Sequence, residues 1–278
     1  MKSIKLSDSE VSALKSSMEE MNIKSDNLKS DNEDLRIKHD NYNFILYKSN
    51  ALVFKDNEIM NNFLKSILKS ASPFNFVIGS DEVGKGEWYG PLVVVAVGMK
   101  PDNLIKYRLS GIKDSKSLSK RKIKKLSEEL LNDESIRFEK IVLLPKSYND
   151  LYLEFTKENK NLNDLMAWAH SRAIENLLKR IKSSELKIKI TIDKFDLQKM
   201  DQRLEKIKAP NINIIQKSKG ESEIPVAIAA ILAKQFFEDE LDVLNEEFNI
   251  NLKRANPNNL SKEILYNVSK LHFSNVPF

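Results

Sequence analysis

The chain has 278 residues, no cysteine, and 45 basic against 40 acidic side chains, which gives a formal charge of +5. This length allows one large domain or two ordinary ones, and the lack of cysteine excludes disulfides, cysteine-ligated zinc, iron–sulfur ligation and thiol nucleophiles. No apolar run approaches the ~20 residues of a membrane span, and the N-terminus has no signal-peptide pattern. We therefore expect a cytoplasmic protein without a membrane partner.

The first seventy residues differ in composition from the rest. They contain neither glycine nor proline, and their basic and acidic side chains balance, so the whole net charge belongs to residues 71–278. Apolar spacing predicts helices over 7–21 and 59–68 and a strand pair over 43–54. The polar stretch 23–40 is compatible with a strand, a loop or a linker. With a boundary expected at Ala71-Ser72-Pro73, residues 1–70 are interpreted as a small α+β module and 71–278 as a larger domain.

The larger domain alternates between strand and helix patterns. Helices are predicted over 120–131, 162–181 and 224–244, and strands over 76–81, 92–99, 138–144, 186–193 and 212–216. The strand over 92–99 is apolar along its whole length, which indicates burial on both faces. Such alternation predicts an α/β domain with a mixed sheet.

Four of the seven glycines lie between Gly79 and Gly90, around the adjacent acids Asp81 and Glu82. Both acids end a predicted buried strand, and buried charge is costly unless it is paired or bound to a metal. A solvated strand end explains the pair equally well when it is taken alone. Neighbouring side chains of a strand point to opposite faces, so the acids share one site only if the strand ends or twists there. Gly84 would permit that.

Two further acids occupy the ends of predicted elements. Asp193 ends a strand, and Glu221 directly precedes a helix. Taken singly, a turn-forming aspartate and an acid that complements a helix dipole explain them better. Taken together, four such acids form the oxygen-rich environment that Mg²⁺ selects. Two ions held there could position and activate a water against a phosphodiester.

The stretch 106–125 carries nine basic side chains, opposed only by Asp114. A solvated helix face explains most runs of this kind. Opposite an acidic metal site, however, binding of a phosphate backbone is the better explanation.

Other residues that often carry chemistry form no catalytic pattern. His170 lies in the middle of the 162–181 helix and is interpreted as a packed or exposed residue rather than a catalytic one. No Ser/His/Asp triad or P-loop is visible.

Six segments form an ordered set along the chain. They are DEVGKGEWYGP at 81–91, GIKDSKSL at 111–118, LNDL at 162–165 with AH at 169–170, IDKF at 192–195, KGES at 219–222 with AAILAK at 229–234, and LHFSN at 271–275. This set resembles the motifs of the type 2 ribonucleases H, specifically ribonuclease HIII. The resemblance implies a ribonuclease H-like mixed sheet flanked by helices, preceded by a small α+β module similar to the TATA-box-binding-protein fold.

The resemblance also implies an activity and its residues. It implies endonucleolytic cleavage of the RNA strand of RNA–DNA hybrids in DNA replication and repair, with Mg²⁺ or Mn²⁺, leaving 5′-phosphate and 3′-hydroxyl ends. A monomer that acts on hybrid nucleic acid is expected. The acids implied to be catalytic and to hold the metal are Asp81, Glu82, Asp193 and Glu221. The residues implied to bind substrate, partly through the 2′-hydroxyls that distinguish RNA from DNA, are Gly84, Lys85, Gly86, Lys113, Ser115 and Lys116.

Several alternatives stay open. A glutamate as the fourth acid favours ribonuclease HIII, but Lys85 stands where HIII usually has threonine and HII usually has arginine. An HII-like enzyme that acts at single ribonucleotides and RNA–DNA junctions is therefore kept. A non-catalytic hybrid-binding protein would have no reason to hold four carboxylates beside phosphates, which repel them. A Mg²⁺-dependent DNA nuclease is a third alternative. Cleavage tests on an all-DNA duplex would distinguish it from a ribonuclease H.

Overall fold

The computed structural model describes residues 1–278 except 40, 111, 113–118, 194–203 and 218–222. It divides the chain into two compact units, Met1–Phe76 with Met99–Ile112 and Val77–Gly98 with Lys113–Phe278. The boundary expected after residue 70 lies just before the first change of unit. The return of Met99–Ile112 to the first unit was not predicted, because it depends on contacts between distant segments. The functional division at residue 70 stays a prediction.

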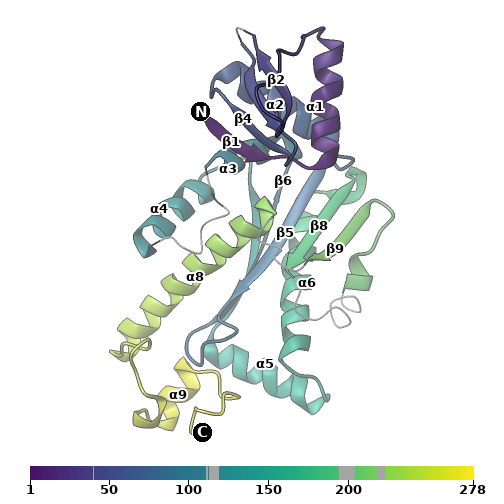
Figure 1. Cartoon of the computed structure of the whole chain (residues 1–278). Coiled ribbons are helices and arrows are strands. Elements are labelled where there is room, and N and C mark those ends of the chain that lie inside the picture. The colour runs from purple at the N-terminus through teal and green to yellow at the C-terminus, as the bar shows by residue number, and fades with distance from the viewer. Residues whose placement is uncertain (40, 111, 113–118, 194–203, 218–222) are drawn as a thin grey trace. The chain divides into compact units, whose positions relative to one another are not determined.

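The first unit is built on a four-stranded antiparallel sheet in the order β1-β4-β3-β2 (Figure 1). Alternate residues of β3 and β4 are buried in one core with the apolar faces of α1 and α2. The α+β module is thus confirmed, and the open stretch 23–40 contains strand β2. The elements are β1 (Lys2–Lys5), α1 (Asp8–Glu20), β2 (Glu33–Lys38), β3 (Asn43–Tyr47), β4 (Ala51–Phe54), α2 (Glu58–Ala71) and α3 (Leu104–Leu109).

Helix α1 begins with a capping box, in which Ser7 and Glu10 each accept a hydrogen bond from the other's main-chain N–H. Glu10 is buried and also accepts two hydrogen bonds from the Arg108 guanidinium of α3, at 2.9 and 2.8 Å. A bidentate pair of this kind is both strong and directional. Arg108 therefore ties the returning segment into the first unit.

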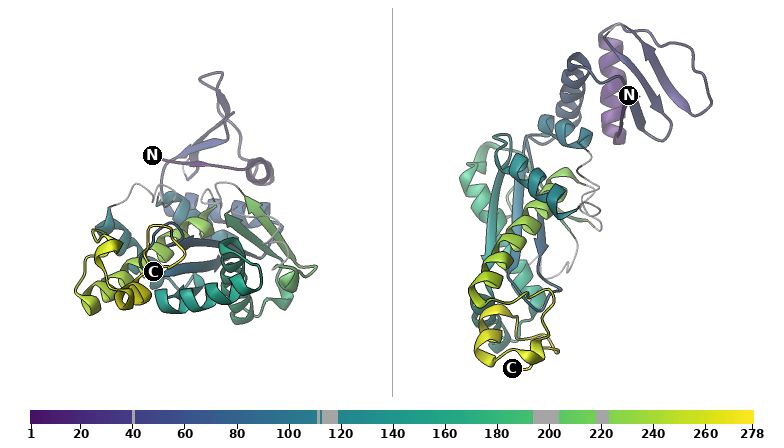
Figure 2. Two further views of the ribbon diagram at one scale, coloured as in Figure 1. Left: turned by 90° about the horizontal axis from the view of Figure 1, so that it is seen from below. Right: turned by 90° about the vertical axis from the view of Figure 1, so that its left-hand side faces the viewer.

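The second unit contains a five-stranded sheet in the order β7-β6-β5-β8-β9. Strands β6 and β7 pair antiparallel and β8 and β9 pair parallel, so the predicted mixed sheet is confirmed. Its strands are β5 (Phe76–Val83), β6 (Leu92–Met99), β7 (Arg137–Leu143), β8 (Ile188–Asp193) and β9 (Ile212–Lys217). Its helices, seen from two further sides in Figure 2, are α4 (Lys120–Leu131), α5 (Pro145–Lys157), α6 (Leu162–Arg180), α8 (Ile224–Phe248) and α9 (Lys262–Val268).

The central strand β5 is covered on both faces. A Cβ atom on Gly79 would lie 2.2 Å from the Val226 main-chain nitrogen, so glycine allows the first turn of α8 to approach the strand closely. The next residue, Ser80, contacts His170 of α6 instead. Because side chains alternate along a strand, α8 packs on the face of the odd-numbered residues and α6 on the face of the even-numbered ones. None of the helices in the described part of the chain has the length and apolar character needed to cross a membrane.

Candidate active site

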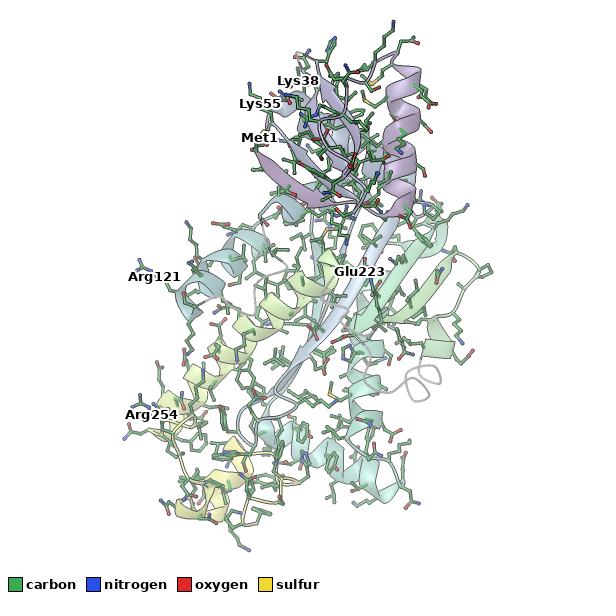
Figure 3. All side chains as sticks on the ribbon, in the orientation of Figure 1. Met1, Lys38, Lys55, Arg121, Glu223 and Arg254 are labelled. Carbon is green, nitrogen blue, oxygen red and sulfur yellow. The ribbon has the colours of Figure 1, made fainter. Side chains whose placement is uncertain are left out.

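Three of the four predicted acids lie at the ends of two adjacent strands. Asp81 and Glu82 lie near the C-terminal end of β5, just before Gly84. Asp193 is the last residue of β8, the neighbouring strand. Glu221 lies outside the described residues. Within the described ranges, no three His, Asp or Glu side chains come together closely enough to form a metal site by themselves. The described acid next to Glu221 is Glu223, which occupies the N-cap position of α8 without a side-chain capping bond and is labelled in Figure 3.

The Glu82 carboxyl is largely buried and yet favours its ionised form. Burial alone raises its pKa, but the hydrogen bond and charge of His170, together with the Lys85 charge and a side-chain hydrogen bond with Asp81, place the pKa below its ordinary value. Asp81 thus affects the ionisation of Glu82, although the side chains of neighbouring residues in a regular strand point to opposite faces. The main-chain N–H of Glu82 also donates to Asp81 Oδ1 at 2.8 Å.

His170 joins this strand end from helix α6. Its side chain is completely buried, Nε2 lies 3.2 Å from Glu82 Oε2, and Nδ1 lies 2.8 Å from Ser80 Oγ. Of the two positions expected for His170, packed or exposed, the structure shows the packed one. Its contact with a candidate catalytic acid was missed. The signals in the sequence are its position on the apolar face of α6 and its place in the AH segment at 169–170, and neither reveals which strand it meets.

The glycine-rich loop that follows β5 uses its glycines differently. Gly84 has a φ of +97°, and a Cβ atom there would lie 2.1 Å from the Pro91 carbonyl oxygen, so the turn requires glycine. Gly86 is exposed, and a Cβ atom would meet nothing within 4 Å. The fold of the described residues therefore does not explain a glycine at position 86.

The far end of the same loop is held by the C-terminal segment. Lys270 is completely buried, and its ammonium donates to the carbonyl oxygens of Glu87, Tyr89 and Gly90 at 3.0, 3.0 and 2.8 Å. Burial lowers the pKa of Lys270 to about 7, against a smaller opposite effect of the Glu87 charge. The Lys270 main chain also donates to the Trp88 carbonyl at 2.7 Å. This role of the residue before the LHFSN motif was not predicted.

Basic residues of the stretch 106–125 pair with acids in different parts of the protein. Arg108 is paired with Glu10 inside the first unit, and Lys120 lies 2.5 Å from Glu238, a buried acid of α8 that Lys234 and Lys253 also contact. Burial raises the pKa of Glu238, but the hydrogen bonds from Lys120 and Lys253 outweigh burial. The pKa of Glu238 therefore lies below its ordinary value, which favours the ionised form. Lys113, Ser115 and Lys116 lie outside the described residues. Arg108 and Lys120 thus have partners within the protein, which weakens the interpretation of the whole stretch as a phosphate-binding surface.

Comparison with known proteins identifies the family to which this chain belongs. The ribonuclease HII family model matches residues 78–256, a range that includes all four acids and the glycine-rich loop. The chain belongs to the ribonuclease HII family. Members of this family are type 2 ribonucleases H, which cleave the RNA strand of RNA–DNA hybrids with divalent metal ions. The resemblance stated from the motifs is therefore confirmed, and the protein is an enzyme of the ribonuclease H type.

The chain is similar to ribonucleases HIII within that family. It is 32% identical over 207 residues to ribonuclease HIII of Protochlamydia amoebophila, covering 70% of this chain and 65% of that protein. It is 31% identical over 254 residues to ribonuclease HIII of Chlamydia caviae, covering 82% and 81%. The crystal structure of Bst ribonuclease HIII in complex with Mn²⁺ aligns over 99% of this chain and 96% of that one, with a TM-score of 0.64 and 23% identity. This neighbour supports the expected fold, including the N-terminal module.

Proposed function

We propose that this chain hydrolyses the RNA strand of RNA–DNA hybrids at the ends of β5 and β8, leaving 5′-phosphate and 3′-hydroxyl ends. The observation that carries the proposal is that two neighbouring strands of the sheet both carry acidic residues at their ends. Asp81 and Glu82 end β5, Asp193 ends β8, and all of them lie inside the range that matches the family model. Hydrolysis of this polarity breaks the P–O3′ bond, and a water supplies the oxygen that joins the phosphate.

The residues at this site suit divalent ions. Carboxylate oxygens are the ligands that Mg²⁺ and Mn²⁺ prefer, and the lowered pKa of Glu82 keeps one of them charged although it is largely buried. We propose that Asp81, Glu82 and Asp193 hold two ions, with Glu221 as the fourth ligand. The ions would stabilise charge on the scissile phosphate and lower the pKa of the attacking water. Mg²⁺ is proposed as the ion used and Mn²⁺ as a substitute. The solved neighbour in complex with Mn²⁺ supports the use of a divalent ion.

The chain's own residues have separate tasks in this proposal. Asp81 and Asp193 lie on neighbouring strands, so we propose that the sheet sets the separation of their carboxylates. Lys85 is close enough to lower the pKa of Glu82, and its ammonium is suited to a phosphate that enters beside the acids. Lys113, Ser115 and Lys116 are proposed to hold phosphates of the hybrid, as the family motif implies.

The loop supplies the distinction between RNA and DNA. Gly84 sets the path of the turn, whereas Gly86 has free space where a side chain would be. A glycine that the protein's own packing does not require is suited to close approach by a ligand backbone. We propose that the main chain at Gly84, Lys85 and Gly86 contacts the RNA strand and its 2′-hydroxyls. The predictions of a monomer and of a cytoplasmic enzyme stay predictions.

A cleavage assay with three substrates tests the proposal. Wild type and Asp81→Asn are given an end-labelled RNA–DNA hybrid, the matched all-DNA duplex and a duplex with one ribonucleotide, with Mg²⁺ or Mn²⁺. We expect wild type to cut the hybrid, to leave the all-DNA duplex intact, and to lose about 100-fold or more of its rate in Asp81→Asn, because a metal ligand is removed. A hybrid left uncut by folded wild type, or cut equally by both proteins, contradicts the proposal. Preferred cutting of the single-ribonucleotide duplex would favour the HII-like alternative.

A further inference from the structure

We propose that His170 is a positioning residue that holds the Glu82 carboxylate at the active site, and that Ser80 fixes the orientation of its imidazole ring. The inference rests on the proposed function, since it assigns Glu82 to the group of metal ligands. The structure places the three side chains in a chain of two hydrogen bonds, from Ser80 Oγ to His170 Nδ1 at 2.8 Å and from His170 Nε2 to Glu82 Oε2 at 3.2 Å.

The arrangement follows from the geometry of two elements. Ser80 and Glu82 are two residues apart on β5, so their side chains leave the same face of the strand. Helix α6 packs against that face and places one imidazole between them. Ser80 and His170 have no exposed surface, and 16% of the Glu82 side chain is exposed. This chain of two hydrogen bonds, which we call the relay, therefore begins at a fully buried serine and ends at a partly exposed glutamate.

The hydrogen on Nε2 follows from the partners. If Ser80 donates to Nδ1, the neutral ring carries its hydrogen on Nε2, and a doubly protonated ring carries one on each nitrogen. A ring protonated on Nδ1 alone would turn a lone pair toward the carboxylate, which is repulsive. In both favourable forms His170 donates to Glu82, so the positioning role does not depend on how the ring titrates.

Positioning has a clear physical benefit here. A free glutamate side chain loses rotamer entropy when it is fixed in one geometry. A buried donor that holds the carboxylate beforehand removes part of that cost from metal binding. Groups that orient metal ligands in this way change metal affinity or activity by about 10- to 100-fold when they are replaced.

A nucleophilic triad is a different interpretation of the same three residue types. A serine nucleophile must reach a substrate, and Ser80 is completely buried. In nucleophilic triads the serine bonds to Nε2 and the acid to Nδ1, which is the reverse of the order found here. The acid, and not the serine, lies at the open end of the relay.

Two substitutions at one position separate positioning from packing. His170→Gln places an amide N–H near the former Nε2 and can still donate to Glu82, but it gives up the bond to Ser80. His170→Asn places its amide near the former Nδ1, so it can bond to Ser80 but does not reach Glu82. Both remove the same ring from the core, so we expect similar losses of stability in urea denaturation.

The decisive readout is Mn²⁺ affinity by calorimetry without substrate, together with kcat and KM for hybrid cleavage. We expect His170→Asn to lose about 10- to 100-fold in Mn²⁺ affinity and in kcat at fixed Mn²⁺, with KM for the hybrid nearly unchanged. His170→Gln should stay within about 3-fold of wild type, a rescue that simple packing does not predict. Equal losses in the two variants, or losses that follow stability instead of the bond to Glu82, would overturn the proposal.

A milder variant keeps the test decisive if neither substitution folds. Ser80→Ala removes only the hydroxyl that orients the ring, and we expect a several-fold loss of Mn²⁺ affinity. Unchanged affinity in Ser80→Ala would then overturn the proposal. Failure of the proposed function is distinguishable, because wild type would leave the hybrid uncut while the Mn²⁺ titrations still report on Glu82.

Discussion

The two ends of the loop between β5 and β6 are both held by buried, ionisable side chains, but by different means. At the β5 end, His170 contacts the side chain of Glu82. At the β6 end, Lys270 contacts three main-chain carbonyls, those of Glu87, Tyr89 and Gly90. A contact to a side chain adjusts one functional group, whereas contacts to the main chain set the path of the loop. We infer that the first end is built for chemistry and the second for stability.

The C-terminal segment reinforces the second end. Tyr89 and Ser269 form an antiparallel bridge, and Gly90 donates to the Val268 carbonyl at 2.9 Å. Asn149 of α5 donates to the Ser269 carbonyl at 2.9 Å. The contacts of Tyr89 and Gly90 join segments about 180 residues apart in sequence, and the Asn149 bond joins residues 120 apart. None of them involves a predicted catalytic acid.

The largest effect that would sharpen this comparison is the loss of the Lys270 ammonium. Lys270→Met leaves three buried carbonyls without their donor, at about 1–3 kcal/mol each, partly offset because a charge is no longer buried. We expect a net loss of about 2–4 kcal/mol in the free energy of unfolding, measured by urea denaturation. The exposed Lys262 provides a matched control, since Lys262→Met should change stability by less than about 0.5 kcal/mol. Equal effects of the two substitutions would remove the distinction between the two ends.

A smaller effect is expected in the pH dependence of stability. Burial lowers the pKa of Lys270 from its ordinary 10.5 to about 7. Between these values the unfolded chain binds more protons than the folded one, so this group makes stability rise with pH above 7. The free energy of unfolding of wild type, relative to Lys270→Met, should therefore rise between pH 7 and 9 by up to ~1.4 kcal/mol per pH unit.

Three titratable groups lie near Lys270. The Glu87 charge acts on Lys270 directly, and burial lowers the pKa of His272 and raises that of Tyr148. All three are also present in Lys270→Met, so the parts of their contributions that do not depend on Lys270 cancel in the difference. The Lys270 charge lowers the His272 pKa further below its ordinary 6.5, which lies outside the range of pH 7 to 9. A difference that stays constant from pH 7 to 9 would mean that Lys270 remains an ammonium throughout.

The sequence predicted the elements that carry the site better than the contacts that complete it. Apolar runs identified β5 and β6, and the helix predicted from residue 224 begins there as α8. Helix α5 and strand β1 were not predicted. Strand β1 is four residues long with one buried residue, so its pattern is too short to recognise.

The missed contacts share a physical cause. His170 meets Glu82 only because α6 packs on one face of β5, and Lys270 meets the glycine-rich loop only because the C-terminal segment returns to it. Both depend on tertiary packing between distant segments, which local spacing does not encode. The acids themselves were found because a strand end with adjacent carboxylates is a local pattern.

The central claim is that the ends of β5 and β8 form one hydrolytic site, and Asp193 tests it most directly because it lies on the second strand. The measurement is the initial rate of hybrid cleavage by Asp193→Asn with Mn²⁺, beside Asp242→Asn as a control on the exposed surface of α8. We predict a loss of about 100-fold or more in Asp193→Asn, equivalent to ~2.7 kcal/mol of transition-state stabilisation. The control should stay within about 2-fold of wild type. A folded Asp193→Asn that cleaves the hybrid at the wild-type rate would contradict the account.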